Sequence, residues 1–128
     1  MNYNPKPNLL ASVEDILNLD KAMRFAAVID LNGNILEGIM NENKTSLESQ
    51  KQTEEFCKDA AKARKMREVY DNTLGKVRYV HTERENVTQI HSYTQNCTIF
   101  ITMEPELSIT KKLQIITKIV IFLEYTVI

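Results

Sequence analysis

Glycine is scarce in this chain of 128 residues, and its scarcity excludes the common nucleotide-binding loops. The three glycines stand at positions 33, 38 and 75. A dinucleotide-binding loop or a nucleoside-triphosphate loop needs closely spaced glycines, so neither can be assembled from these positions. Nucleotide hydrolysis by this chain is therefore not expected.

Cysteines and long apolar runs are also few. Cys57 and Cys97 have no metal-ligand spacing, and a disulfide between them would suit only an oxidising compartment, so we expect both to be reduced. The apolar run Ile119–Leu123 is far shorter than the ~20 residues of a membrane span. Residues 1–8 are rich in Asn and Pro and lack the apolar segment of a secretory signal. We expect a cytoplasmic protein without a membrane span, a metal or a cofactor.

The first half of the chain contains a helical pattern, two strand patterns and a second, longer helical pattern. A short helix is predicted from about Ser12, which is followed by the apolar segment 25–29 and, after an Asn-Gly turn, by a returning strand over 35–40. Segment 25–29 is apolar at every position, which predicts a strand covered on both faces. A long amphipathic helix is expected from Thr45, with Glu48 completing a capping box, to about Thr73.

The second half contains three strand patterns and a closing helix. Short polar connections separate segments 76–83, 87–93 and 97–103, and connections of this length are typical of an antiparallel meander. Segment 76–83 is polar on both faces and is predicted to be an edge strand, whereas 97–103 is apolar and should be central. The last helix is expected to begin at Ser108 or Thr110, and its wide apolar face requires two neighbours.

These patterns predict one domain of the α/β (α+β) class over residues 10–128. The chain is long enough to bury a core without a disulfide or metal. Two prolines within residues 1–9 disfavour regular structure, so this segment is predicted to be a flexible tail.

Candidate catalytic groups are sparse. The histidines are His81 and His91, and Glu83 is the nearby carboxylate that could tune them as general bases. The alternative, half-buried histidines on a sheet surface, fits the sequence better because no nucleophile or orienting group accompanies them. We therefore expect no catalytic or metal site and no enzymatic activity.

A ligand pocket is a second hypothesis. Tyr79, His81, His91 and Tyr93 could line such a pocket between sheet and helix if they face the same side. The alternative is ordinary core packing, which is the usual fate of aromatic side chains.

Basic residues are concentrated in one part of the sequence. Lys58–Arg84 holds eight Lys or Arg against four Asp or Glu, although the whole chain carries a net charge of −1. Three interpretations follow: a solvated helix face, a surface for an acidic protein, or a phosphate-backbone contact made by Arg64, Lys65, Arg67, Arg78 and Arg84. A nucleic-acid partner is not expected because the chain as a whole is not basic.

Two segments carry a resemblance to a known family. The run FAAVIDLNGNILEG over 25–38 resembles the first strand, turn and second strand of Roadblock/LC7 domains, which belong to the profilin-like group. The run RYVHTERENVTQIH over 78–91 resembles the edge hairpin that follows their long helix. With the order of elements, the resemblance covers about Ser12 to Tyr125, and it extends to small archaeal proteins of the same arrangement.

The resemblance implies the order α-β-β-α-β-β-β-α and a five-stranded antiparallel sheet with strand order 2-1-5-4-3. It also implies that the long helix covers one face and the two terminal helices cover the other. Family members commonly act as non-enzymatic platforms that bind or regulate small GTPases or motor complexes. A regulatory interaction module is therefore the expected function, with a small-molecule sensor of profilin-like architecture as the alternative.

The resemblance further implies a homodimer formed by the third strand and the long helix. An exposed strand edge is itself a physical reason to expect self-pairing. Alternatively, the polar side chains of the third strand protect this edge and the chain is monomeric. The corresponding surface consists of Ala60, Ala63, Arg67, Tyr70, Lys76, Arg78, Val80 and Thr82.

Overall fold

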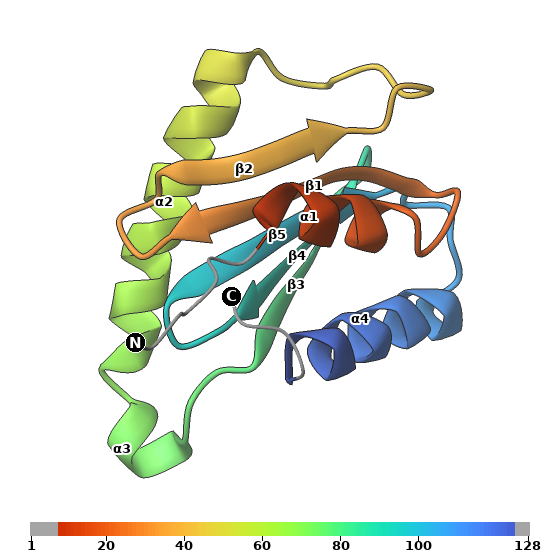
Figure 1. Cartoon of the computed structure of the whole chain (residues 1–128). Coiled ribbons are helices and arrows are strands. Elements are labelled where there is room, and N and C mark those ends of the chain that lie inside the picture. The colour runs from red at the N-terminus through yellow and green to blue at the C-terminus, as the bar shows by residue number, and fades with distance from the viewer. Residues whose placement is uncertain (1–7, 125–128) are drawn as a thin grey trace, which may run out of the picture.

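A computed structural model describes residues 8–124 and shows one five-stranded antiparallel sheet in the order β2-β1-β5-β4-β3. This order and the placement of the helices confirm the predicted fold class (Figure 1). The elements, in chain order, are α1 (Leu9–Leu17), β1 (Met23–Asp30), β2 (Ile35–Met40), α2 (Gln50–Glu68), α3 (Asp71–Leu74), β3 (Tyr79–Glu83), β4 (Thr88–Tyr93), β5 (Cys97–Met103) and α4 (Ile109–Glu124).

The strands agree closely with the sequence patterns. β2 and β5 have the predicted bounds, and β1 lies inside the sheet between them. β3 is the edge strand, as predicted, but it begins at Tyr79 rather than Lys76. The carbonyl of Arg78 still accepts a hydrogen bond from the Tyr93 amide at 2.9 Å. The hydrogen bonds between β3 and β4 therefore begin at Arg78, which is opposite the last residue of β4.

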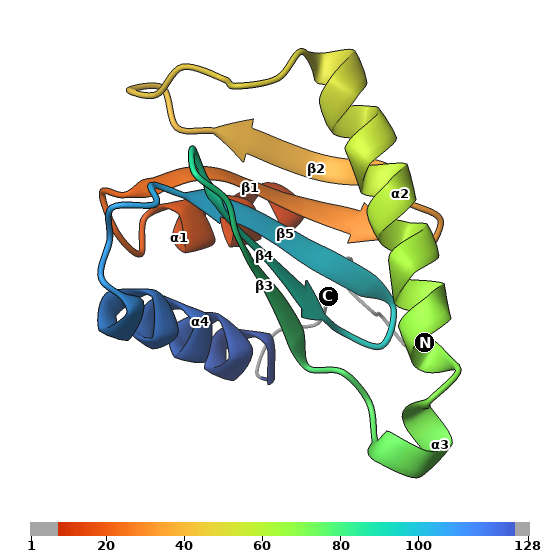
Figure 2. The same cartoon turned by 180° about the vertical axis from the view of Figure 1, so that it is seen from behind.

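α1 and α4 cover one face of the sheet, and the views in Figures 1 and 2 place α2 on the other. Val13 and Ile16 of α1 meet Ile115 and Ile119 of α4 in one buried cluster with the facing side chains of β1, β4 and β5. Each of these four side chains is at most 1% exposed. The wide apolar face of α4 thus contributes to the main core, as expected from its pattern.

The α2 face has a smaller core. Ala27 and Ile29 of β1, Phe100 of β5 and Cys57 of α2 form its buried cluster. The turn between β1 and β2 touches α2 directly: Gly33 has a φ of 88°, and a Cβ on it would lie 2.6 Å from the Cα of Lys58. Glycine is required here both for the backbone conformation and for the close approach of the two segments.

The helix starts differ from the predictions. α1 begins at Leu9 because the Asn8 side chain accepts a hydrogen bond from the Ala11 amide, whereas the Ser12 hydroxyl donates to the Asn8 carbonyl. The predicted tail therefore ends before Leu9, and its first seven residues lie outside the described part of the chain.

The long helix begins at Gln50 rather than Thr45. Ser49 and Gln52 form a complete capping box, and this pair replaces the predicted box of Thr45 and Glu48. Leu47 falls within the predicted helix range, but it lies in the loop before α2 and is 58% exposed. The helix is interrupted after Glu68, and a single further turn, α3, ends at Gly75 with a φ of 84°.

Candidate functional site: an open strand edge beside a partly covered sheet face

The backbone of β3 has a free hydrogen-bonding side. In the β3–β4 ladder, Val80 is opposite His91 and Thr82 is opposite Gln89. The bonds at Arg78 and Arg84 on either side show that even-numbered residues of β3 direct their backbone groups toward β4. The backbone amides and carbonyls of Tyr79, His81 and Glu83 therefore point away from β4, beyond the edge of the sheet. Such an edge is a template for another strand.

The C-terminal part of α2 comes near the start of β3, because Arg67 borders the same hollow as Lys76 and Arg78. Ala60, Ala63 and Arg67 follow one another at helical spacing, and Arg67 donates a hydrogen bond from Nη1 to the Tyr93 hydroxyl at 3.0 Å. The two alanines are partly buried, and Tyr70, farther along, is 60% exposed. Small side chains on this flank leave room for another backbone to approach α2.

The eight predicted dimer residues thus fall on two neighbouring elements and their connection. Val80 and Thr82 are half-buried and face the same side of the sheet as α2, while Lys76 and Arg78 are exposed at the start of the edge. We refer to these residues with the α2 residues as the edge surface: Ala60, Ala63, Arg67, Tyr70, Lys76, Arg78, Val80 and Thr82.

Arg64 fixes the C-terminal part of α2 to the sheet. Its guanidinium donates to the carbonyl of Cys97 at 2.7 Å, to the Thr98 hydroxyl at 3.0 Å and to the carbonyl of Thr94. It also pairs with Glu68 and lies 4.5 Å from the ring centre of Tyr93. Arg64 was predicted to belong to an exposed basic face. It is instead 8% exposed, because a guanidinium with several acceptors can be buried.

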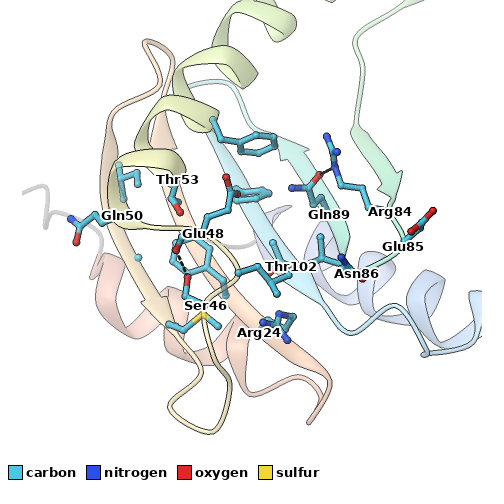
Figure 3. Close-up of a pocket in the computed structure, with 18 residues that line it drawn as sticks. Arg24, Ser46, Glu48, Gln50, Thr53, Arg84, Glu85, Asn86, Gln89 and Thr102 are labelled. Carbon is cyan, nitrogen blue, oxygen red and sulfur yellow. Dashed lines mark hydrogen bonds between the residues drawn. The ribbon is translucent and has the colours of Figure 1, made fainter.

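A hollow of about 920 Å³ opens on the same face, where α2 leaves the sheet uncovered. Its walls come from the loop before α2 and from the β3–β4 hairpin, and Figure 3 shows Ser46 and Glu48 across from Arg84 and Gln89. The Nε of Arg84 donates to Oε1 of Gln89 at 2.8 Å. The volume of the hollow lies within the range of small-molecule sites.

Aromatic side chains form the floor of this hollow. Phe25, Phe56 and Phe100 line it, with ring centres 6.0 Å apart for Phe25–Phe100 and 5.3 Å apart for Phe56–Phe100. The sequence patterns did not identify this site. The signal available was the alternation in β5, which places Phe100 and Thr102 on the same face.

His91 lies beside the aromatic floor. Its ring stacks on Phe100 at 4.7 Å, and its Nε2 is buried with no hydrogen-bond partner among the described residues. Burial lowers the pKa of His91 to about 4, and the charge of Arg67 acts in the same direction. The ring is thus neutral at pH 7 and serves as a packing element.

The four residues predicted to line a ligand pocket lie on opposite faces of the sheet. His91 and Tyr93 face α2, as their contacts with Phe56 and Arg67 show. Tyr79 and His81 alternate with Val80 and share the α4 face with Glu83. The structure does not bring the two pairs together, because the β3–β4 register places His91 opposite Val80 and Ile90 opposite His81.

Glu83 connects the edge strand β3 to α4. Both of its carboxylate oxygens lie 3.0 Å from Nζ of Lys112 in α4, and they also accept hydrogen bonds from the Thr88 hydroxyl. His81 Nε2 lies 3.0 Å from Oε1. Although burial acts to raise the pKa of Glu83, the hydrogen bonds from His81, Lys112 and Thr88 hold it below its ordinary value. This carboxylate is a structural anchor.

Both thiols are free and buried. Burial raises the pKa of Cys57 to about 11, with the charges of Glu48 and Glu54 adding to the effect. Within residues 8–124, no three His, Cys, Asp or Glu side chains gather closely enough to hold a metal ion. Over that same range, none of the helices combines the length and apolar character needed to span a membrane.

The fold defined by this sheet and its helices is that of a small Roadblock/LC7-like α/β domain. A Roadblock/LC7 domain from Streptomyces avermitilis aligns at a TM-score of 0.64 and 9% identity, over 88% of this chain and 91% of that chain. The gliding protein MglB from Thermus thermophilus aligns at 0.70 and 12%, over 91% and 92%. Profilin IB from Acanthamoeba castellanii aligns at 0.63 and 12%, over 91% and 96%.

The sequence itself identifies a narrower group. Residues 8–124 match the model of a family of unknown function, DUF6659, and the chain belongs to that family. A search of curated proteins gives no match. At identities this low, the similarity to Roadblock/LC7 domains and profilins shows the fold alone.

Proposed function

We propose that this protein is a non-enzymatic regulatory module that forms a homodimer through the edge surface and presents the joined sheets to a protein partner. The observation that carries this proposal is the outward-facing backbone of β3, and the small side chains of α2 lie on the sheet face toward which Val80 and Thr82 point. Pairing two β3 strands would satisfy both edges at once and would bring the two α2 flanks together.

The exposed charges of the edge surface are basic, so they favour an acidic partner. Two copies can pair there only if their arginine side chains point away from each other. Lys76 and Arg78 are exposed, and among the described residues neither forms an ion pair. Family resemblance favours a small GTPase as the partner. The proposed role is cytoplasmic and non-catalytic, and the similarity of fold to a Roadblock/LC7 domain supports it.

Light scattering after gel filtration tests the dimer. We expect a mass of twice 14.8 kDa for the native chain. His81→Pro removes an outward-pointing amide at an edge position where proline is tolerated, and Ala63→Arg introduces bulk on the α2 flank. Both variants should be monomeric. His81→Ala is the matched control, because it removes the imidazole but keeps the amide. A monomeric native protein, or a dimer unaffected by both variants, would refute the edge surface.

Capture of proteins from the host on the immobilised chain tests whether the partner is a small GTPase. The native dimer should retain a GTPase from its host in a manner that depends on whether a GTP analogue or GDP is supplied, and His81→Pro should lose this retention. Retention that is the same with both nucleotides would contradict a regulatory GTPase complex while leaving the dimer intact.

A second candidate function, small-molecule sensing, is supported by the hollow above Phe25, Phe56 and Phe100. Metabolites that bind there should raise the melting temperature of the native protein. Thr102→Phe, which fills the hollow from β5, should abolish the shift. A library that raises the melting temperature of neither protein would leave the hollow as a packing feature or a surface covered by the second copy.

A further inference from the structure

The outward flank of α2 carries a row of lysines. Lys58, Lys62 and Lys65 follow at spacings of four and three residues, which places them on one side of the helix. All three are exposed, and none forms an ion pair within residues 8–124. The exposed carboxylates of Glu55 and Asp59 lie three residues before Lys58 and Lys62, and Glu68 is bonded to Nε of Arg64 at 3.0 Å.

The lysine row ends in apolar side chains that face water. Met66 is 73% exposed, Val69 is 75% exposed, and Leu74 of α3 is 81% exposed. α3 projects beyond the end of α2, away from the sheet (Figures 1 and 2). We call the lysine row and these three apolar residues the basic–apolar ridge. Exposed apolar side chains gathered in this way mark an interaction site more often than isolated ones do.

The ridge is separate from the edge surface. At 3.6 residues per turn, Lys62 and Val69 lie on one flank of α2 and Ala60, Ala63 and Arg67 lie on the other. Arg67 reaches Tyr93 and so marks the flank that faces the sheet. A dimer formed through the edge surface therefore leaves the lysine row of α2 exposed.

We propose that the basic–apolar ridge binds the surface of an anionic lipid membrane. The lysine ammonium groups would lie among lipid phosphates and carboxylates, and the tips of Met66, Val69 and Leu74 would enter the boundary of the acyl chains. The positive charge of the ridge comes from its three lysines, because Arg67, Lys76 and Arg78 belong to the edge surface and Arg64 is buried.

The residue types distinguish a membrane from other anionic partners. Lysine is depleted in the cores of protein–protein interfaces, where Arg and aromatic residues are enriched, and the ridge contains neither. Single-stranded nucleic acids are bound through aromatic stacking, which the ridge does not offer. Flexible lysines beside exposed aliphatic tips are instead typical of peripheral membrane helices.

Co-sedimentation of the full chain with vesicles tests the proposal. The protein should pellet with vesicles of phosphatidylcholine and phosphatidylserine at low salt, should be released at high salt, and should not pellet with phosphatidylcholine alone. Each lysine near an anionic surface is worth roughly fivefold in partitioning, so Lys62→Glu/Lys65→Glu should weaken binding by about 25-fold or more.

The matched control is Lys21→Glu/Lys118→Glu, which changes the net charge equally at exposed lysines outside the ridge. It should bind more tightly than Lys62→Glu/Lys65→Glu by at least about fivefold. Val69→Ser/Leu74→Ser tests the apolar tips and should weaken binding without removing its salt dependence. Circular dichroism and light scattering establish that each variant keeps the native fold and mass.

Three results would overturn the membrane proposal. The first is failure of the native protein to pellet with phosphatidylserine vesicles at low salt. The second is equal weakening by both double-lysine variants, which would show only the effect of net charge. The third is retention on polyglutamate without binding to vesicles, which would assign the ridge to an acidic protein. None of these results bears on the dimer, because the lysine row and the α2 residues of the edge surface are on different flanks of the helix.

Discussion

On the side of α1 and α4, side chains from β1, β4 and β5 form one continuous core, whereas on the side of α2 the packing is interrupted. The first side buries Ile99, Ile101 and Met103 almost completely. The second side has the hollow above Phe56 and Phe100 and buries the polar side chains of Arg64 and His91. The same strands therefore provide one face for stability and another that stays available for binding.

The difference follows from how each helix is held. α4 lays apolar side chains over the sheet, so its position depends on contact area. α2 is held at points: Gly33 against its middle, Cys57 in the small core, and Arg64 at its C-terminal part. A helix fixed at a few points leaves sheet surface open between them.

The largest expected effect is a cavity in the continuous core. Ile99→Ala removes a side chain that is 0% exposed and should lower the free energy of unfolding by about 4 kcal/mol. Phe56→Ala, in the half-covered face, should cost only about 1–2 kcal/mol, because water already reaches its ring. Urea unfolding of both variants measures the two values. Equal losses would show that the faces are packed equally well.

A smaller effect is expected where the hairpin turn touches α2. Gly33→Ala strains a positive φ and drives a Cβ against the backbone of Lys58, so it should destabilise by about 3 kcal/mol. Gly75→Ala has a similar φ but nothing within 4 Å of the new Cβ, and it should cost about 1 kcal/mol. Thermal unfolding compares the two. Similar losses would mean that contact with α2 adds nothing to the cost at Gly33.

The sequence predicted the covered face better than the open one. The uninterrupted apolar run in β1 and the Asn-Gly turn identified the central strands, because burial on both faces requires apolar residues at successive positions. The polar pattern of β3 likewise identified an edge. These are local signals, and the resemblance to Roadblock/LC7 domains added the strand order.

The candidate sites depended on which side chains face which layer, and local patterns did not reveal this. Arg64 resembles its basic neighbours in sequence, yet the carbonyls that bury it belong to residues 94 and 97. The start of α2 was misplaced because two possible capping boxes, at Thr45 and Ser49, lie within five residues. The second one forms, and the carbonyl of Thr45 instead accepts a hydrogen bond from Nη2 of Arg24. Long-range partners of this kind require the folded structure.

The ion pair between Glu83 and Lys112 joins β3 to α4 on the covered face, and its two partners should respond differently to substitution. Lys112 is 2% exposed, so Glu83→Gln leaves a buried ammonium without its counter-charge and should cost about 2 kcal/mol. Lys112→Met leaves a carboxylate that still contacts water, His81 and Thr88, and should cost less than about 1 kcal/mol. Chemical denaturation at pH 7 measures both; a larger loss for Lys112→Met would contradict this account.

The smallest expected effect is a pH dependence from His91 on the half-covered face. Its pKa is lowered from 6.5 to about 4 in the folded protein, so the unfolded chain binds the proton more readily. The contribution of this group to stability is complete above pH 6.5 and declines as the pH falls from there toward 4. Between pH 7.5 and 5.5 the native protein should lose about 1 kcal/mol of unfolding free energy through this group.

His91→Phe isolates that contribution, because phenylalanine keeps the stack on Phe100 and does not titrate. All other residues are the same in both proteins, so the difference between the two stability curves belongs to His91. The variant should be the less pH-sensitive of the two below pH 6.5. Parallel curves would mean that water or a hydrogen-bond acceptor reaches the imidazolium from the hollow, and the α2 face would then be more open than the packing around Phe56 and Phe100 indicates.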